Sequence, residues 1–340
     1  MKLSRAIFFS ILLLVTLATS LFFNSHPLRE AHSSATTVGD IANLASTAAV
    51  GHKDFDLAVT ELPVGDGNVS DGPRVGNVFA CNQTFRTGGA RHVGEWFHGD
   101  TWNPLEKPHV QGEVSWPEAT FDMAERATVL AVASNGLPVG SPTGTFPIAR
   151  TDPAYAYDTN PNAIAAQSLA FNIPLEPVAV DSPGCLSMGM IGFTLNGVAF
   201  YNALDDAGHD AAAHEVQDLC NGHPQGKGQY HYHSSSPCLS GAQENTVIGW
   251  ALDGYPILGM KDAAGTTLSN ADLDACHGRS EQVSVDGREY DYAYRLTPEY
   301  PYTLSCFAGQ VLSETRQSIR QSMGPPQQRD ANGRPQRRLR

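Results

Sequence analysis

The chain has 340 residues, enough for two domains or for one large β domain with tails. Residues 24–312 hold 13 Lys and Arg residues against 33 Asp and Glu residues, and a body this acidic argues strongly against a nucleic-acid-binding core. The 41% of hydrophobic residues suffices for a sizeable core, while 32 glycines and 22 prolines argue against a helical bundle.

The N-terminal 23 residues carry an export signal. Lys2 and Arg5 precede an unbroken apolar run over 6–23, which is typical of a signal peptide. Its 18 residues are also just enough to span a bilayer, so residues 1–23 are predicted to be a signal peptide or a membrane anchor. Both alternatives predict an exported protein that is periplasmic, at the cell surface or secreted. If the segment is an anchor, it also binds the protein to the membrane.

Two polar segments flank the body. Residues 24–74 are predicted to be a tether and lead-in, because their first part is rich in Ala, Ser, Thr and His. Residues 313–340 are rich in Arg, Gln and Pro and are predicted to be a disordered tail. The intervening residues 75–312 form the predicted domain.

Six cysteines lie in this exported chain, and their even number favours three disulfides. Sequence alone does not choose among fifteen pairings. Pairing near neighbours predicts the bonds Cys220–Cys238 and Cys276–Cys306, which leaves Cys81 to pair with Cys185.

A short hairpin pattern recurs along the body. Asn-Gly or Asp-Gly stands between apolar runs at 135–136, 196–197, 253–254 and 286–287, as expected of two-residue type I′ turns. The fold is therefore predicted to be mainly β, an antiparallel sandwich or partly closed barrel. One short helix is predicted around 207–219, with Asp210 as its cap.

Histidines are concentrated in one part of the body, where five of the twelve lie between 209 and 233. Residues 230–233 read Tyr-His-Tyr-His, so on a strand His231 and His233 share one face and the tyrosines share the other. Two imidazoles on one face can bind one transition-metal ion. His223 is the predicted third ligand, and His214 or Glu215 the fourth.

Three further residues are candidates to support the metal ligands, and motifs of other kinds of site are absent from the sequence. Tyr230, Tyr232 and Asp253 are predicted to support the ligands, although the tyrosines also suit an aromatic packing face and Asp253 suits a turn. Asp205-Asp206 lacks the spacing of a calcium loop. The chain also lacks a Gly-x-Ser-x-Gly elbow, a His-Glu-x-x-His pair and a phosphate loop.

Ordered landmarks from about 130 to 309 resemble the YHYH-domain family. They include SNGLP (134–138), MGMIGFTLNGV (188–198), E-x-x-D-x-C-N-G-H (215–223), YHYH, IGWALDGYPILG (248–259) and LDACHG (273–278). The resemblance implies an exported β domain in which the histidine cluster is a family feature, and it implies no reaction. Many members carry a histidine shortly after SNG-x-P, where this chain has Val139-Gly140.

Three functions follow from these observations. The first is an exported module that binds copper or zinc, with the metal ion as its partner. The second is a metal-dependent hydrolase or oxidoreductase with an open metal position. The third is a metal-free, disulfide-stapled interaction module whose protein partner the sequence does not identify.

Overall fold

The computed structural model describes residues 36–38, 60–85, 90 and 92–323. The predicted N-terminal signal or anchor therefore lies outside the described residues, as does most of the predicted tether. Among the described residues, no helix is both long and apolar enough to cross a membrane.

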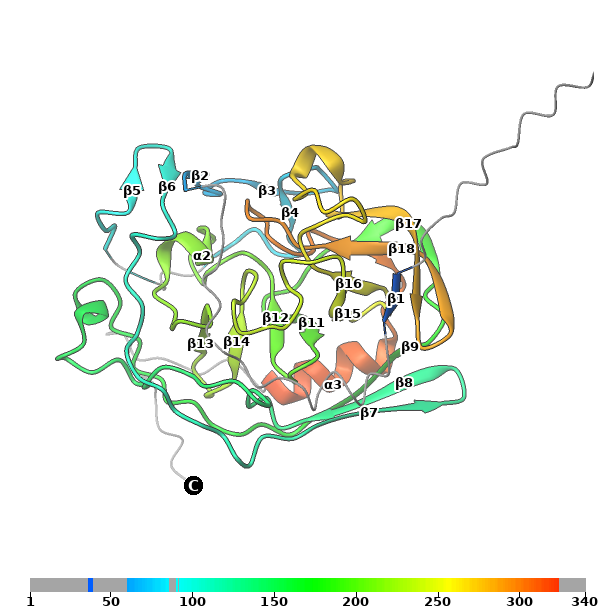
Figure 1. Cartoon of the computed structure of the whole chain (residues 1–340), viewed down its shortest axis with the longest axis horizontal. Helices are drawn as coiled ribbons and strands as arrows, with labels where there is room; N and C mark the ends of the chain where they lie inside the picture. The colour runs from blue at the N-terminus through cyan, green and yellow to red at the C-terminus, as the bar shows by residue number, and fades with distance from the viewer. Residues whose placement is uncertain (1–35, 39–59, 86–89, 91, 324–340) are drawn as a thin grey trace, which may run out of the picture. The chain divides into compact units, whose positions relative to one another are not determined.

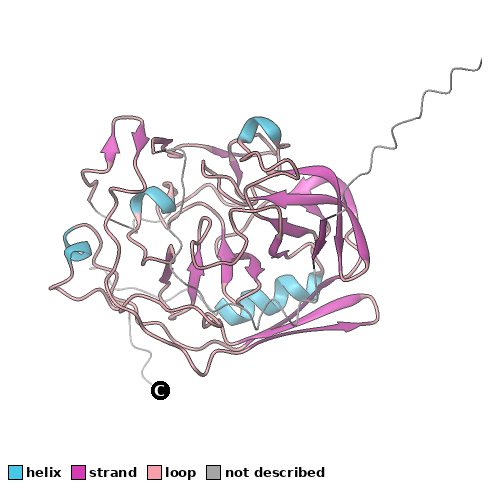
Figure 2. Ribbon diagram, viewed as in Figure 1, coloured by secondary structure: helices cyan, strands magenta, loops and turns pink. Residues whose placement is uncertain are grey.

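Strands dominate the fold, as the hairpin pattern predicts (Figures 1 and 2). The largest sheet has nine strands in the spatial order β1-β17-β18-β16-β15-β11-β12-β14-β13, and its end strands β1 and β13 do not pair to close a barrel. In that order the strands are β1 (Thr36–Val38), β17 (Gly278–Val285), β18 (Arg288–Arg295), β16 (Pro256–Leu258), β15 (Val247–Ala251), β11 (Met190–Thr194), β12 (Ala199–Tyr201), β14 (Tyr230–Tyr232) and β13 (Gly222–Pro224).

Four smaller sheets surround the large one. They are β7 (Phe121–Arg126), β8 (Val129–Ser134) and β9 (Leu169–Pro174); β2 (Leu62–Pro63), β6 (Thr101–Trp102) and β5 (Phe97–His98); β3 (Val69–Ser70) with β4 (Val78–Phe79); and β10 (Ala179–Gly184) with β19 (Phe307–Gly309). The β7–β9 sheet packs face to face on β11, because the Phe193 ring contacts those of Phe121 and Phe171 at centroid distances of 6.0 and 5.6 Å. This packing is that of a sandwich.

The large sheet is mixed rather than wholly antiparallel. The pairs β1·β17, β16·β18 and β12·β14 are parallel, and the other described pairs of this sheet are antiparallel. Most pairs are therefore antiparallel, as predicted, and the parallel pairs join strands that are not consecutive in sequence. Among these, β14 joins β12 across the long connection that contains the short helix α2 (Ala211–His214).

Three of the four predicted turns connect paired strands, but only one is type I′. Asp286 and Gly287 both have positive φ, 50° and 77°, between β17 and β18. At 196–197 and 253–254 only the glycine has positive φ, and a three-residue loop closes each hairpin. Asn135-Gly136 is not a hairpin: Asn135 instead bonds the backbone at Glu118 and Thr120, and the chain leaves the sheet until β9.

The predicted helix at 207–219 is much shorter in the structure. Asp210 caps it as predicted, with its carboxylate 3.3 Å from the Ala213 N–H, but α2 ends at His214 and Glu215 is extended. The next residue donates its backbone N–H to Asp158, so a tertiary contact replaces the further helical turn. The other short helices are η1 (Pro153–Ala156) and η2 (Asn270–Asp272).

Both predicted flanking segments contribute ordered structure. Leu62, in the lead-in, is buried in the main core, and Gly65 donates its N–H to Asp210 at 2.9 Å. Residues Ser313–Met323 form α3, which packs on β9 with Ile319 buried. The prediction of disorder from residue 313 was therefore wrong for this helix, and residues 324–340 lie outside the described part of the chain.

Candidate metal centre

The three predicted histidines meet at one end of the large sheet. β13 and β14 pair antiparallel with His223 directly opposite His231, and His233 follows β14 immediately. One ligand atom from each of the three lies within 4.8 Å of the others, and all three side chains are buried. The predicted alternation of residues 230–233 is what places two of these rings side by side.

The Nε2 atoms of His231 and His233 face each other. His231 Nδ1 lies 3.1 Å from the carbonyl oxygen of Gln229, and His233 Nδ1 lies 2.5 Å from that of Asn202. Because a carbonyl only accepts, each Nδ1 carries the proton in the neutral ring and each Nε2 keeps its lone pair. The two Nε2 atoms are 3.0 Å apart, so only a cation, either a proton or a metal ion, satisfies both.

Glu215 lies beside this cluster. Its Oε2 atom lies 3.3 Å from His223 Nε2 and 3.5 Å from His233 Nε2. Neither this oxygen nor either ring nitrogen of His223 has a hydrogen-bond partner, although all three atoms are buried. Buried polar atoms are satisfied in the great majority of cases, so this concentration of orphans is unusual and the cluster could hold a metal ion.

Burial sets the charge of the cluster. It lowers the pKa of His233 to about 4 and holds the pKa values of His223 and His231 well below the usual imidazole range. The three rings are therefore neutral at physiological pH, the form that binds metals. Burial, together with the nearby carboxylates of Asp158 and Asp205, also raises the pKa of Glu215 well above its usual range, which favours the protonated carboxyl group in the metal-free protein.

Three separations among these side chains are close to those around a tetrahedral ion. Ligand distances of about 2.0–2.1 Å place neighbouring donors roughly 3.3 Å apart around zinc. The distances from His231 to His233, from His223 to Glu215 and from His233 to Glu215 are 3.0, 3.3 and 3.5 Å, and the three histidine ligand atoms lie within 4.8 Å of one another. The His₃Glu set is also chemically suited to zinc or copper.

Not every predicted site residue joins the cluster. His214 turns away, and its Nε2 lies 2.9 Å from Asp66. Asp253 supports no histidine, because its carboxylate accepts from the Tyr294 hydroxyl and the Gly309 N–H. It is the turn residue of the β15–β16 hairpin, which was its alternative interpretation.

The tyrosines of the motif point away from the histidines, as the alternation predicts. Tyr230 donates to Asp218, with both carboxylate oxygens within 2.9 Å, and the Tyr232 hydroxyl accepts from Asn196 at 3.2 Å. Both side chains are fully buried. They pack on the face of β14 opposite to the histidines, which was their alternative interpretation.

The sequence did not predict several other residues that contact the histidines or their neighbours. The Tyr201 ring stacks on His231 at a centroid distance of 3.9 Å, and its hydroxyl donates to Gln229. Lys107 is buried, and its ammonium group bonds the Ala212 carbonyl and the Gln217 side chain, which bracket Glu215. Only Gln229, directly before the motif, has a position in sequence that points to the site.

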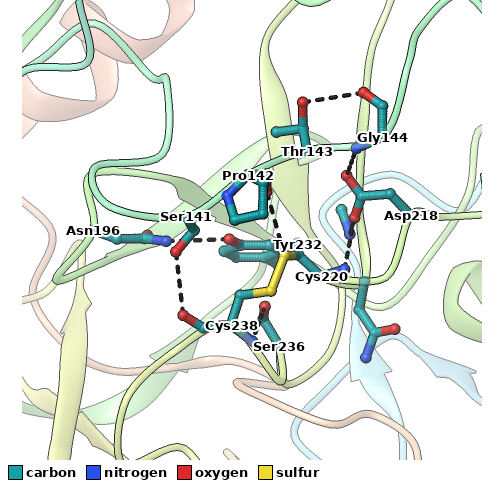
Figure 3. The surroundings of a disulfide bond; sticks show 12 residues. Ser141, Pro142, Thr143, Gly144, Asn196, Asp218, Cys220, Tyr232, Ser236 and Cys238 are labelled. Atoms are coloured by element: carbon teal, nitrogen blue, oxygen red, sulfur yellow. Dashed lines mark hydrogen bonds between the residues drawn. A yellow bond between two sulfur atoms is a disulfide. The ribbon is translucent and has the colours of Figure 1, made fainter. Parts of the chain in front are cut away.

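All three predicted disulfides are present. Cys220–Cys238 closes the segment that carries the three histidines. Figure 3 shows it beside residues 141–144, where Ser141 donates to the Cys238 carbonyl and Gly144 donates to Asp218.

A comparison with protein families finds one match. Residues 170–268 match the family model described as YHYH protein, over less than a third of the chain. The matched segment runs from β9 past β16 and includes Glu215 and all three clustered histidines, so the metal-centre candidate lies within the segment that is similar to YHYH proteins. No curated protein matches the chain, and no solved structure matches it.

Proposed function

We propose that this protein is an exported metal-binding protein whose YHYH domain holds one zinc or copper ion. His223, His231 and His233 supply Nε2 ligands, and Glu215 supplies a carboxylate oxygen. The observation that carries the proposal is the convergence of three buried, neutral imidazoles and the Glu215 carboxyl group, in which Glu215 Oε2 and both His223 nitrogens have no hydrogen-bond partner. A metal ion that displaces the carboxyl proton satisfies the three Nε2 atoms and the Glu215 oxygen at once.

Binding rather than turnover is the function that this geometry supports best. Structural metal sites are closed by four protein ligands, whereas catalytic sites keep a position open for water or substrate. Here four donors surround the site and the three histidines are between 2 and 4% exposed. Export is supported by the three disulfides, since such bonds persist in oxidising compartments.

A metal titration tests the proposal. The full-length protein, stripped of metal by a chelator, is expected to take up about one equivalent of Zn²⁺ or Cu²⁺. The double variant His231→Gln/His233→Gln keeps neutral side chains of similar size and is expected to take up none. A matched control, His92→Ala/His98→Ala, removes two exposed histidines and is expected to bind like the wild type.

Two results overturn the proposal. One is a wild-type protein that binds neither metal, and the other is a His231→Gln/His233→Gln variant that binds as well as the wild type. Near-ultraviolet circular dichroism shows whether the variant keeps its tertiary structure. If it does not, His223→Gln alone provides the same test, because it removes one ligand whose two ring nitrogens make no hydrogen bond.

A further inference from the structure

The turn that follows β12 holds an unsatisfied carboxylate oxygen beneath an exposed histidine. Asp205 Oδ1 accepts the backbone N–H groups of Ala207 and His209, both at 2.8 Å, and so fixes the turn. Asp205 Oδ2 is buried and has no hydrogen-bond partner, and it lies 3.5 Å from His209 Nδ1. The His209 side chain is 49% exposed, so this pair of donors reaches solvent.

This turn adjoins the metal centre. Asn202, three residues before Asp205, accepts the Nδ1–H of His233. The His209 ring also lies 5.2 Å, centroid to centroid, from that of His214, the residue directly before Glu215. The side chain of Glu215 is 15% exposed, compared with 4% for His223 and 5% for His233, so it is the most accessible of these donors.

We propose that the Asp205 turn is the entry route for the metal ion: Asp205 and His209 take the ion from solvent, and Glu215 passes it to the histidines. This inference rests on the proposed function. One carboxylate and one imidazole bind Zn²⁺ or Cu²⁺ too weakly to retain it, which suits a transfer point. The charge of Asp205 concentrates cations beside the buried site and so accelerates their capture.

The rate of metal uptake tests this route. Full-length, metal-stripped protein is mixed with Zn²⁺ in a stopped-flow instrument, and a fluorescent zinc indicator reports the free ion. In the variant Asp205→Asn/His209→Gln, the asparagine oxygen still accepts the two turn N–H groups while both candidate transfer ligands are removed. Its association rate constant is expected to fall about tenfold or more, the lower end of the range for electrostatic steering.

The chain offers a matched control in a second turn of the same design. Asp262 Oδ1 accepts the N–H groups of Ala264 and Thr266, both at 2.9 Å, with the same spacing as at Asp205. Asp262→Asn is therefore expected to leave the uptake rate unchanged. Because a shared route serves entry and exit, the Asp205→Asn/His209→Gln variant is also expected to release Zn²⁺ more slowly and still bind one equivalent.

Two outcomes overturn the route. One is an unchanged association rate constant, and the other is a normal association rate with faster release, which shows that Asp205 acts only on affinity. Failure of the proposed function looks different, because the wild type then takes up no Zn²⁺ at all. If the double variant does not fold, His209→Gln alone retains the test on an exposed side chain.

Discussion

The Nε2 atoms of His231 and His233 face each other at 3.0 Å, while each Nδ1 is committed to a main-chain carbonyl group. The strand places the rings on one face, and the carbonyls of Gln229 and Asn202 select the tautomer. Outer hydrogen bonds of this kind fix ring orientation at metal-binding histidines. The protein therefore builds the site from its backbone as well as from its ligands.

Glu215→Gln tests the fourth donor. The substitution keeps the size of the side chain and removes its charge. The affinity for Zn²⁺ is expected to fall about tenfold or more, because mutating even the hydrogen-bond partners of metal ligands typically lowers metal affinity by that factor. Competition with a chelator of known affinity measures the change. Glu244→Gln, on an exposed residue paired with Lys261, is the control. Equal affinity of Glu215→Gln and the wild type would remove Glu215 from the ligand set.

The disulfide Cys220–Cys238 is expected to support both stability and metal binding. It closes a loop of about 18 residues around the histidines, and the chain-entropy model gives such a bond about 3 kcal/mol of unfolding free energy. Cys220→Ala/Cys238→Ala is therefore expected to lower both the unfolding free energy and the Zn²⁺ affinity. Denaturant titration and chelator competition measure the two effects.

The bond Cys276–Cys306 is the control, because none of the four proposed ligands lies in the loop that it closes. Cys276→Ala/Cys306→Ala is expected to lower the unfolding free energy while the folded protein keeps its Zn²⁺ affinity. Equal losses of affinity in the two double variants would contradict a specific role for Cys220–Cys238.

Lys107 makes the stability of the metal-free protein depend on pH. Burial lowers its pKa to about 7, well below the value of about 10.4 in an unfolded chain. Between these values the unfolded state holds a proton that the native state lacks, so the unfolding free energy rises with pH, by up to about 1.4 kcal/mol per pH unit. The stabilising contribution is lost as the pH falls to 7.

Urea titrations between pH 7 and 10 measure this slope. Lys107→Met keeps the length and burial of the side chain without its charge, and it is expected to flatten the profile. The buried carboxyl groups of Asp210, Asp218 and Asp253 titrate at about 6 and act below this window. Glu215, whose pKa burial also raises, contributes a slope of opposite sign, so the wild-type profile is compared with that of Lys107→Met. A wild-type profile no steeper than that of Lys107→Met would show that Lys107 stays charged.

Tyr230→Phe separates the two faces of β14. The Tyr230 hydroxyl bonds the buried carboxylate of Asp218, and its removal is expected to cost about 1–3 kcal/mol of unfolding free energy. The Zn²⁺ affinity of the folded variant is expected to stay unchanged, since the tyrosine ring points away from the histidines. A loss of affinity without a loss of stability would assign Tyr230 to the metal centre.

Features set by residues close together in sequence were predicted correctly. Strand alternation placed His231 and His233 together, and near-neighbour pairing of cysteines identified all three disulfides. The mainly β class followed from turn residues whose positive φ favours Asn, Asp and Gly.

Tertiary contacts decided what sequence patterns missed. The helix at 207–219 stops at His214, after which Glu215 reaches the histidines and the next backbone N–H bonds Asp158. The helix α3 lies in a segment whose overall composition is polar, and composition alone therefore predicts disorder. Its two buried residues, Thr315 and Ile319, lie one helical turn apart. Tyr201 reaches the site through the parallel pairing of β12 with β14, which no short-range pattern indicates.

Anomalous X-ray diffraction at the zinc edge, from crystals of the full-length protein grown with one equivalent of Zn²⁺, tests the metal centre most directly. The account predicts one anomalous peak about 2.0–2.2 Å from a nitrogen of each of the three histidines and from a Glu215 oxygen. A map with no peak among these side chains, or one with zinc bound only at surface residues, would contradict it.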